Sequence, residues 1–344
     1  MGAFVQDKLV PLWRKFRLVM RTSLFLNLVL TSIVFVVLYA LVESGSVNRY
    51  ISSLIILILV MIIMSTSLNI ATGFLGQLHL GHAAFMGIGA YTASILAIAL
   101  EDVIASDLML FIVVTLAAMV TTGIAGLLIG TPALRLRGDY LGIMTLGFGE
   151  IVKTVITNLK GLTNGAQGLY GIPRIMNFSI AFWTTVIVVA LIFLFMNSRH
   201  GRAILSIRED EIAAESVGIN ITRYKLLGFV IASMFAGVGG SIFGFAIGFI
   251  APTSFNFLKS VEIFVIVVLG GMGSISGAII SSIVLVSLPE LLRDFASYRY
   301  LLYSTLLILI MLFRSEGLLG TKELDLAGYL KKLVARLRPK GSDS

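Results

Sequence analysis

The sequence predicts an all-α polytopic membrane protein with eight to ten transmembrane helices, including one broken or re-entrant segment. Hydrophobic residues make up 58% of the 344 residues and the mean hydropathy is +1.00, whereas soluble domains are about 45–50% apolar. Many apolar stretches reach the roughly 20 residues that a helix needs to cross a hydrocarbon core, and they are too long for barrel strands. Lys and Arg gather in a few connectors, as is typical of multi-pass membrane proteins.

Eight stretches have the length and composition of a membrane helix. The first follows a basic N-terminus, as the apolar part of a signal peptide does, but no A-x-A cleavage site comes after it. We therefore interpret it as a retained first helix. The eight stretches cover residues 24–42, 51–70, 80–100, 108–130, 139–158, 178–196, 226–250 and 300–313.

A ninth apolar stretch, residues 261–288, is interrupted by GGMGSISG from Gly270 to Gly277. Three glycines within four residues disfavour a continuous helix. We expect a re-entrant pair or two tightly linked helices, because one straight crossing would move the basic C-terminal tail across the membrane. Irregular backbone at membrane depth must be buried in protein or line a wet cavity. Gly271 and Gly273 are thus candidate pathway residues, and a plain loop between two helices is the alternative.

The distribution of Lys and Arg predicts the orientation. Of the 26 basic residues, 19 lie before residue 24, at Arg135 and Arg137, within 199–225, and from Arg314 onward. The positive-inside rule then places both termini and the charged loop in the cytoplasm of a bacterial-type inner membrane. This placement explains the formal charge of +8 without nucleic acid.

The same pattern divides the chain into three parts. These are a cytoplasmic basic N-terminus (1–23), a transmembrane domain (24–313) with a cytoplasmic loop (197–225), and a cytoplasmic C-terminal tail (314–344). Residues 324–340 of the tail are basic and amphipathic, which favours contact with anionic membrane lipids, although regulation of a partner is an alternative.

Nine charged residues of the cytoplasmic loop lie between positions 199 and 225. Asp210 can cap a short helix of about two turns, and Gly218 suits the left-handed position after its end. Small apolar residues flanked by charges of both signs can dock in a groove on another protein. The alternative is a solvated surface loop. The candidate contact residues are Arg208, Asp210, Glu211, Ala213, Ala214 and Gly218.

Several blocks of the sequence resemble one family. DEIAAESVG, from Asp210, is a loose version of the E-A-A-x-x-x-G signature in the coupling helix of ABC importer permeases. The further blocks are GFLGQLHLGHAAFMGIGAYTASIL, LRLRGDYLGIMTLGFGEIVK, LTNGAQGLYGIP, VVLGGMGSISG and LFRSEGLLG. Together they cover roughly residues 50–320 and are similar, in the same order, to the LivM-like permeases for branched-chain amino acids.

The resemblance implies the rest of an assembly. Its expected partners are ATP-binding cassette subunits that hold ATP and Mg²⁺, a second homologous permease, and a periplasmic substrate-binding protein. Each permease would form half of the translocation pathway. His79 replaces the usual Ser of the family, and Asn164, Gln167 and Tyr170 vary a loop rich in Gly and small polar residues. These departures keep urea and short amides as alternative substrates.

The chain itself is not expected to be an enzyme or to bind a cofactor. It contains no Gly-Lys dipeptide and hence no G-x-x-x-x-G-K-[ST] phosphate loop. Neither a Ser-His-Asp nor a paired-carboxylate arrangement can be proposed. The absence of cysteine also excludes disulfides and thiolate metal sites.

Polar groups inside the predicted helices are further candidates, since charge at membrane depth is costly and usually marks function. Gln77, His79 and His82 form one cluster, which could line the pathway or form hydrogen bonds in the bundle; without a carboxylate or thiolate it makes a poor metal site. Glu150 and Lys153 could form an i, i+3 pair. A proton relay at Glu150 would instead indicate an ion-coupled secondary transporter of a small polar solute, with a broken-helix site, although no internal repeat supports that class.

Small-residue spacing predicts where helices approach closely. Gly240, Gly244 and Gly248 fall four residues apart, and Gly126 and Gly130 repeat the spacing once. Such patterns are typical of packing faces in membrane bundles.

Overall fold

The computed structural model describes residues 31–41, 48–134, 136, 138–314, 317–320 and 323. The chain divides into two units, one formed by residues 1–48 and 324–344 and the other by residues 49–323. In the first unit the described part is an apolar helix, Thr31–Leu41, which lies inside the predicted first membrane segment. The basic N-terminus and the amphipathic tail fall outside the described residues and stay predictions. All that follows concerns the second unit.

Within the described residues, six helices are long and apolar enough to cross a membrane. They are α2 (Arg49–Asn69) with its π-helical extension η1 (Ile70–Phe74), α3 (His82–Leu100), α4 (Asp107–Ala133), α5 (Asp139–Asn158), α7 (Phe178–Asn197) and α10 (Ile221–Ile247). Helices satisfy their own backbone hydrogen bonds, which is why lipid favours them. The described chain contains no strand, and one isolated bridge pairs Leu169 with Ile250.

Shorter elements connect and flank these helices. They are α6 (Lys160–Thr163), η2 (Gly165–Gln167), α8 (Arg199–Glu209), α9 (Glu211–Ser216), η3 (Pro252–Phe255), α11 (Phe257–Gly270), α12 (Ile275–Leu291), η4 (Arg293–Tyr298) and α13 (Arg299–Phe313). Each of the eight predicted helical stretches therefore coincides with helix wherever the structure describes it, except at residues 80–81 and 248–250. The prediction of an all-α polytopic membrane protein is confirmed.

The predicted break in residues 261–288 is present. Helix α11 ends at Gly270 and α12 begins at Ile275, with a four-residue turn between them in which Gly271 and Gly273 have φ values of 109° and 89°. Helix α11 has 14 residues and α12 has 17. At about 1.5 Å per residue the two helices span roughly 21 and 25 Å, and each is shorter than the hydrocarbon core of about 30 Å. The structure thus has two short helices joined by a tight turn, a feature that both expected forms share.

Helix α10 forms the centre of the core, where glycines let α3 and α4 approach it closely. A Cβ atom on Gly89 would collide with the backbone of Gly237, and one on Gly240 would collide with the carbonyl of Met86. Gly126 likewise meets the hydroxyl of Ser233. The predicted packing role holds for Gly240 and Gly126, and Gly89 adds a contact that was not predicted, because there is no room for a side chain at any of these positions.

Gly248 departs from the predicted packing pattern. It has a φ of 73° and ends α10, and a Cβ atom there would have its nearest neighbour at 4.0 Å. Glycine is favoured at this position because L-residues rarely adopt a positive φ. Its role is therefore to terminate the helix, which corrects the expectation of a third contact in the stripe.

A close glycine contact at the core makes a direct prediction about stability. Gly89→Ala should lower the thermal stability of the purified protein, because the added methyl group forces α3 away from α10 at an overpacking cost of about 1–3 kcal/mol. Gly161→Ala is the matched control, since a Cβ atom there has nothing within 4 Å. Thermal unfolding in detergent measures both. Equal melting temperatures for the two variants would contradict the packing role.

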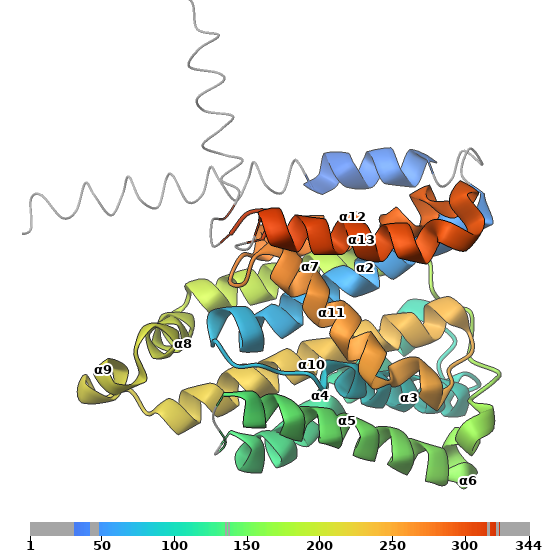
Figure 1. Ribbon diagram of the computed structural model, residues 1–344. Helices are drawn as coiled ribbons and strands as arrows, with labels where there is room; N and C mark the ends of the chain where they lie inside the picture. Colours follow the sequence, from blue (N-terminus) through green and yellow to red (C-terminus); the bar gives the residue numbers. More distant parts are fainter. Residues whose placement is uncertain are drawn as a thin grey trace, which may run out of the picture. The chain divides into compact units, whose positions relative to one another are not determined.

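The two ends of the bundle differ. Figure 1 shows α8 and α9 projecting at one end, with the end of α4 and the start of α5 at that same end and α6 at the other. The described helix ends that flank the α4–α5 connector thus share one end of this unit with the charged loop, which agrees with the positive-inside interpretation. We call this end the loop end.

Candidate functional site: the loop-end helix and the interrupted membrane segments

The predicted short helix of the charged loop forms as α9. The Asp210 carboxylate accepts hydrogen bonds from the backbone N–H groups of Ile212 (2.8 Å) and Ala213 (3.0 Å), and Gly218 follows the helix with a φ of 86°. Both ends are therefore built as the sequence predicts, because a carboxylate satisfies the free donors of the first turn and glycine accommodates the left-handed position.

Helix α9 is fastened to the bundle by a charged pair. The Lys225 ammonium at the start of α10 donates to the Glu211 carboxylate, and Lys225 is buried, at 7% exposed. A lysine this deeply buried needs its partner, because an unpaired charge in low dielectric is costly. Glu211 therefore fixes α9 to α10, which gives this predicted contact residue a structural role in the chain itself.

One face of α9 is left uncovered. Ile212 is 81% exposed and Val217 is 76% exposed, and Ala213 lies exposed beside Ile212. Ala214 is 3% exposed and points into the chain, which corrects the expectation that it belongs to the contact face. A capped helix that holds a large apolar side chain in water is typical of a protein contact surface.

Arg208, another predicted contact residue, turns toward the membrane helices. Its guanidinium Nη1 donates to the carbonyl oxygen of Gly73 at 3.0 Å, and its Nη2 pairs with the Glu209 carboxylate at 2.8 Å. Gly73 belongs to the π-helical end of α2, so this bond joins the loop to the transmembrane bundle. The Arg208 side chain is 27% exposed.

The chain between α2 and α3 runs non-helically through residues 75–81. Gln77, His79 and His82 are all buried here, within the predicted cluster. The Leu80 N–H donates to the Thr145 hydroxyl of α5 (3.1 Å), and the Ala83 N–H donates to that of Ser260 in α11 (3.0 Å). These two backbone N–H groups have no helical partner, and hydroxyl groups of neighbouring helices accept from them instead. Irregular backbone in a membrane protein requires such partners.

The two histidine rings contact each other within this cluster. Their centroids are 5.6 Å apart, and His82 Nε2 lies 2.9 Å from the Ser67 hydroxyl. Both Nδ1 atoms, and Gln77 Oε1, are buried without a hydrogen-bond partner among the described residues. The structure therefore places the cluster inside the bundle and brings its three members together. The sequence around the cluster does not indicate that Thr145 and Ser260 are its hydrogen-bond partners, because both residues lie far away along the chain.

Glu150 lies away from this cluster, on α5. Its carboxylate pairs with the Lys153 ammonium at 2.9 Å, and the two side chains are 43% and 31% exposed. The predicted i, i+3 pair is confirmed. About 11 residues of 1.5 Å each separate Glu150 from the start of α5, which places the pair near mid-helix.

The glycine turn between α11 and α12 is held by two side chains that sequence reasoning did not select. Asn69 of α2 accepts from the Gly273 N–H and donates to the Ser274 carbonyl, each at 2.9 Å. The Glu323 carboxylate accepts from the Ile275 N–H at 2.6 Å and from Ser276. An Asn inside a predicted membrane helix is the signal that could have identified Asn69, since polar groups at membrane depth are costly. Nothing marks Glu323.

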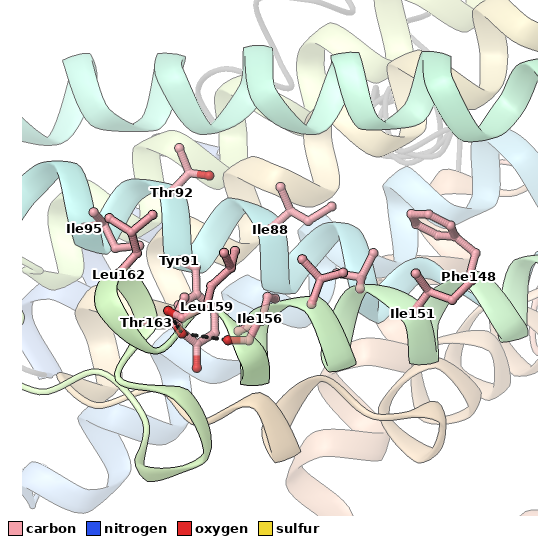
Figure 2. Close-up of a pocket in the computed structure, with 12 residues that line it drawn as sticks. Ile88, Tyr91, Thr92, Ile95, Phe148, Ile151, Ile156, Leu159, Leu162 and Thr163 are labelled. Atoms are coloured by element: carbon pink, nitrogen blue, oxygen red, sulfur yellow. Dashed lines mark hydrogen bonds between the residues drawn. The ribbon is translucent and has the colours of Figure 1, made fainter.

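A cavity of about 380 Å³ lies between α3, α5 and α6 (Figure 2). Its hydroxyl groups are already engaged: Tyr91 donates to the Ile250 carbonyl at 3.3 Å, Thr163 donates to the Ile156 carbonyl at 2.6 Å, and Thr92 accepts from Thr121 at 3.3 Å. No charged side chain lines it. Burying the charged groups of a zwitterion there would be costly, so the cavity suits apolar groups and not a whole amino acid.

Comparison with known proteins identifies the family. The family described as branched-chain amino acid transport system / permease component matches residues 50–313. This chain belongs to that family. It is therefore a multi-pass permease component of a transport system.

The relatives of this permease include proteins named LivM and LivH. The high-affinity branched-chain amino acid transport system permease protein LivM of Salmonella typhimurium is 37% identical over 76% of this chain and 68% of its own length. A probable LivM of Methanocaldococcus jannaschii is 24% identical over 69% and 77%. LivH of Escherichia coli is 28% identical over 74% and 89%. No solved structure matches the permease.

Proposed function

We propose that this permease forms half of the translocation pathway of an ATP-driven importer, with the loop end in the cytoplasm and α9 docked on an ATP-binding cassette subunit. The observation that carries the proposal is the exposed apolar face of α9. Ile212 in α9 and Val217 directly after it are exposed. The helix is capped by Asp210 and fastened to α10 by the Glu211–Lys225 pair. A rigid apolar anchor surrounded by charge is what a docking groove recognises.

The second half of the pathway would come from a homologous permease. Support comes from the similarity of this chain to both LivM and LivH proteins and from α5. Gly147, Thr154 and Asn158 lie exposed on one face of that helix, with the Glu150–Lys153 pair beside them. Polar groups and an ion pair at membrane depth favour a protein partner or a wet pathway over lipid.

The substrate we propose is a branched-chain or similar small apolar amino acid, because relatives at 37% and 24% identity are both named as branched-chain amino acid permeases. Capture by a periplasmic binding protein would leave the permease to provide only weak polar contacts. The buried Gln77, His79 and His82 cluster, with its unpaired acceptor and ring nitrogens, and the turn at Gly271 and Gly273 are the proposed polar elements beside that path. Urea or a short amide is the second candidate.

Competition uptake distinguishes the two substrate classes. In proteoliposomes that hold the complete complex, uptake of radiolabelled leucine in the presence of the binding protein should fall when unlabelled isoleucine or valine is added and should persist when urea or acetamide is added. The opposite pattern would replace the amino acid with an amide while leaving the ATP-driven importer intact. Control liposomes lacking internal ATP correct for leakage.

A further inference from the structure

Three segments that are far apart in the sequence meet at the loop end of the bundle. The π-helical end of α2 contributes Gly73, the turn between α11 and α12 contributes Gly273, and α8 contributes Arg208. A Cβ atom on Gly73 would collide with the Gly273 backbone, and one on Gly273 would lie 2.8 Å from Arg208 Nη1. The α2 and α11–α12 segments therefore meet backbone to backbone, and α8 reaches them through the Arg208 side chain. We call this contact the loop-end junction.

The junction is closed by hydrogen bonds on both sides. Asn69, fully buried one residue before the π-helix, binds both the N–H of Gly273 and the carbonyl of Ser274. The Gly73 carbonyl lies at a helix end, where oxygen atoms lack intrahelical partners, and the Arg208 guanidinium supplies the missing donor at 3.0 Å. A charged donor makes this a stronger bond than a neutral one.

Neither membrane segment at the junction continues as a regular α-helix there. Helix α2 ends in a π-helical turn, a form that often occurs at functional positions, and the α11–α12 turn relies on glycines in the left-handed region. Hinge motions are absorbed by a few residues in loops or at the ends of elements, whereas continuous packed helices move as rigid bodies. A force applied at Arg208 would therefore reach the parts of the bundle that can rearrange.

We propose that Arg208 is a positioning residue that links the docking loop to the loop-end junction, so that displacement of α8 and α9 moves the ends of α2 and α11 together. This inference rests on the proposed docking of α9 on an ATP-binding subunit. It reassigns Arg208 from the docking surface to the transmission of motion, since its guanidinium is engaged with Gly73 and Glu209. The Glu211–Lys225 pair fastens the other side of the loop to α10.

The test compares two arginines of α8 in the complete reconstituted complex. Arg208→Gln should leave complex assembly and ATP hydrolysis near the wild-type level while lowering the substrate imported per ATP by about tenfold, the scale of one lost charge-assisted hydrogen bond. Arg202→Gln is the control: Arg202 is exposed and donates to the Asn197 carbonyl within its own loop at 3.1 Å. It should not change the ratio of import to hydrolysis.

Two results would overturn the inference. If Arg208→Gln lowers hydrolysis and import by the same factor, Arg208 contacts the ATP-binding subunit directly. If the variant imports normally, the bond to Gly73 transmits nothing. Failure of the proposed function has a different signature, since the wild-type complex would then show no ATP-driven import at all.

A second measurement keeps Arg208 in place and so does not depend on the variant folding. The chain contains no cysteine, so Arg202→Cys on α8 and Met272→Cys in the exposed turn can carry spin labels in a complex whose other subunits lack accessible cysteines. The distance between the labels should stay within about 3 Å when ATP and vanadate are added, because linked elements shift together. A larger change in this distance would show that the loop moves independently of the junction.

Discussion

Ile212→Asp is expected to lower ATP-driven import by the reconstituted complex at least tenfold and to reduce the ATP-binding subunit that co-purifies with the permease. Ile212 is 81% exposed and is the large apolar side chain that α9 presents on its uncovered face. Central apolar anchors of an interface typically contribute about 2 kcal/mol or more, which is more than tenfold in affinity. An aspartate would also have to lose its hydration in the groove.

Val103→Asp is the matched control for this variant. Val103 is another β-branched residue, 76% exposed, in the turn after α3 at the other end of the bundle. Both variants add one negative charge at an exposed apolar position, so a general effect on expression or solubility would appear in both. Normal co-purification and import with Ile212→Asp would show that α9 does not dock through this face.

Glu150→Gln should reduce the amount of assembled complex several-fold, because it leaves the Lys153 ammonium unpaired at membrane depth. The expected cost is below the roughly 2.5–3.5 kcal/mol for a charge at helix centre, since both side chains of the pair are partly exposed. The double variant Glu150→Gln, Lys153→Gln removes both charges and should restore assembly toward the wild-type level. Quantitative purification with matched expression measures all three.

A different outcome at Glu150 would favour the secondary-transporter alternative. In that case Glu150→Gln would assemble normally, abolish uptake and remove any dependence of uptake on a proton gradient. The structural interpretation instead requires that whatever complex assembles keeps its dependence on ATP. Measuring uptake per assembled complex, with and without a proton gradient, separates the two.

Local chemistry explains why most of the fold could be predicted. Long apolar stretches specify helices because lipid offers the backbone no other partner, and the boundaries of α5 and α7 agree with the sequence to within a residue. The cap by Asp210 and the left-handed Gly218 are equally local, since both depend on neighbours within the same turn. The Glu150–Lys153 pair likewise depends only on helical spacing.

The features that were missed depend on contacts between distant segments. The inward turn of Arg208 depends on the carbonyl of Gly73, 135 residues away, and the clamp by Asn69 depends on a turn 204 residues further along. The residues around Ala214 in the sequence predict that it is a contact residue. Only the packing of the loop in the structure shows that it is buried. Hydrophobic periodicity carries no information about such pairings, so the loop-end junction could not be predicted from the sequence.

The most direct test of the importer account is substrate uptake by proteoliposomes containing this permease, its homologous partner, the ATP-binding subunits and the binding protein. The account predicts uptake only when ATP is present on the side of the membrane that carries α9, and no uptake by the permease alone. Uptake by the permease alone, driven by an ion gradient without ATP, would contradict it.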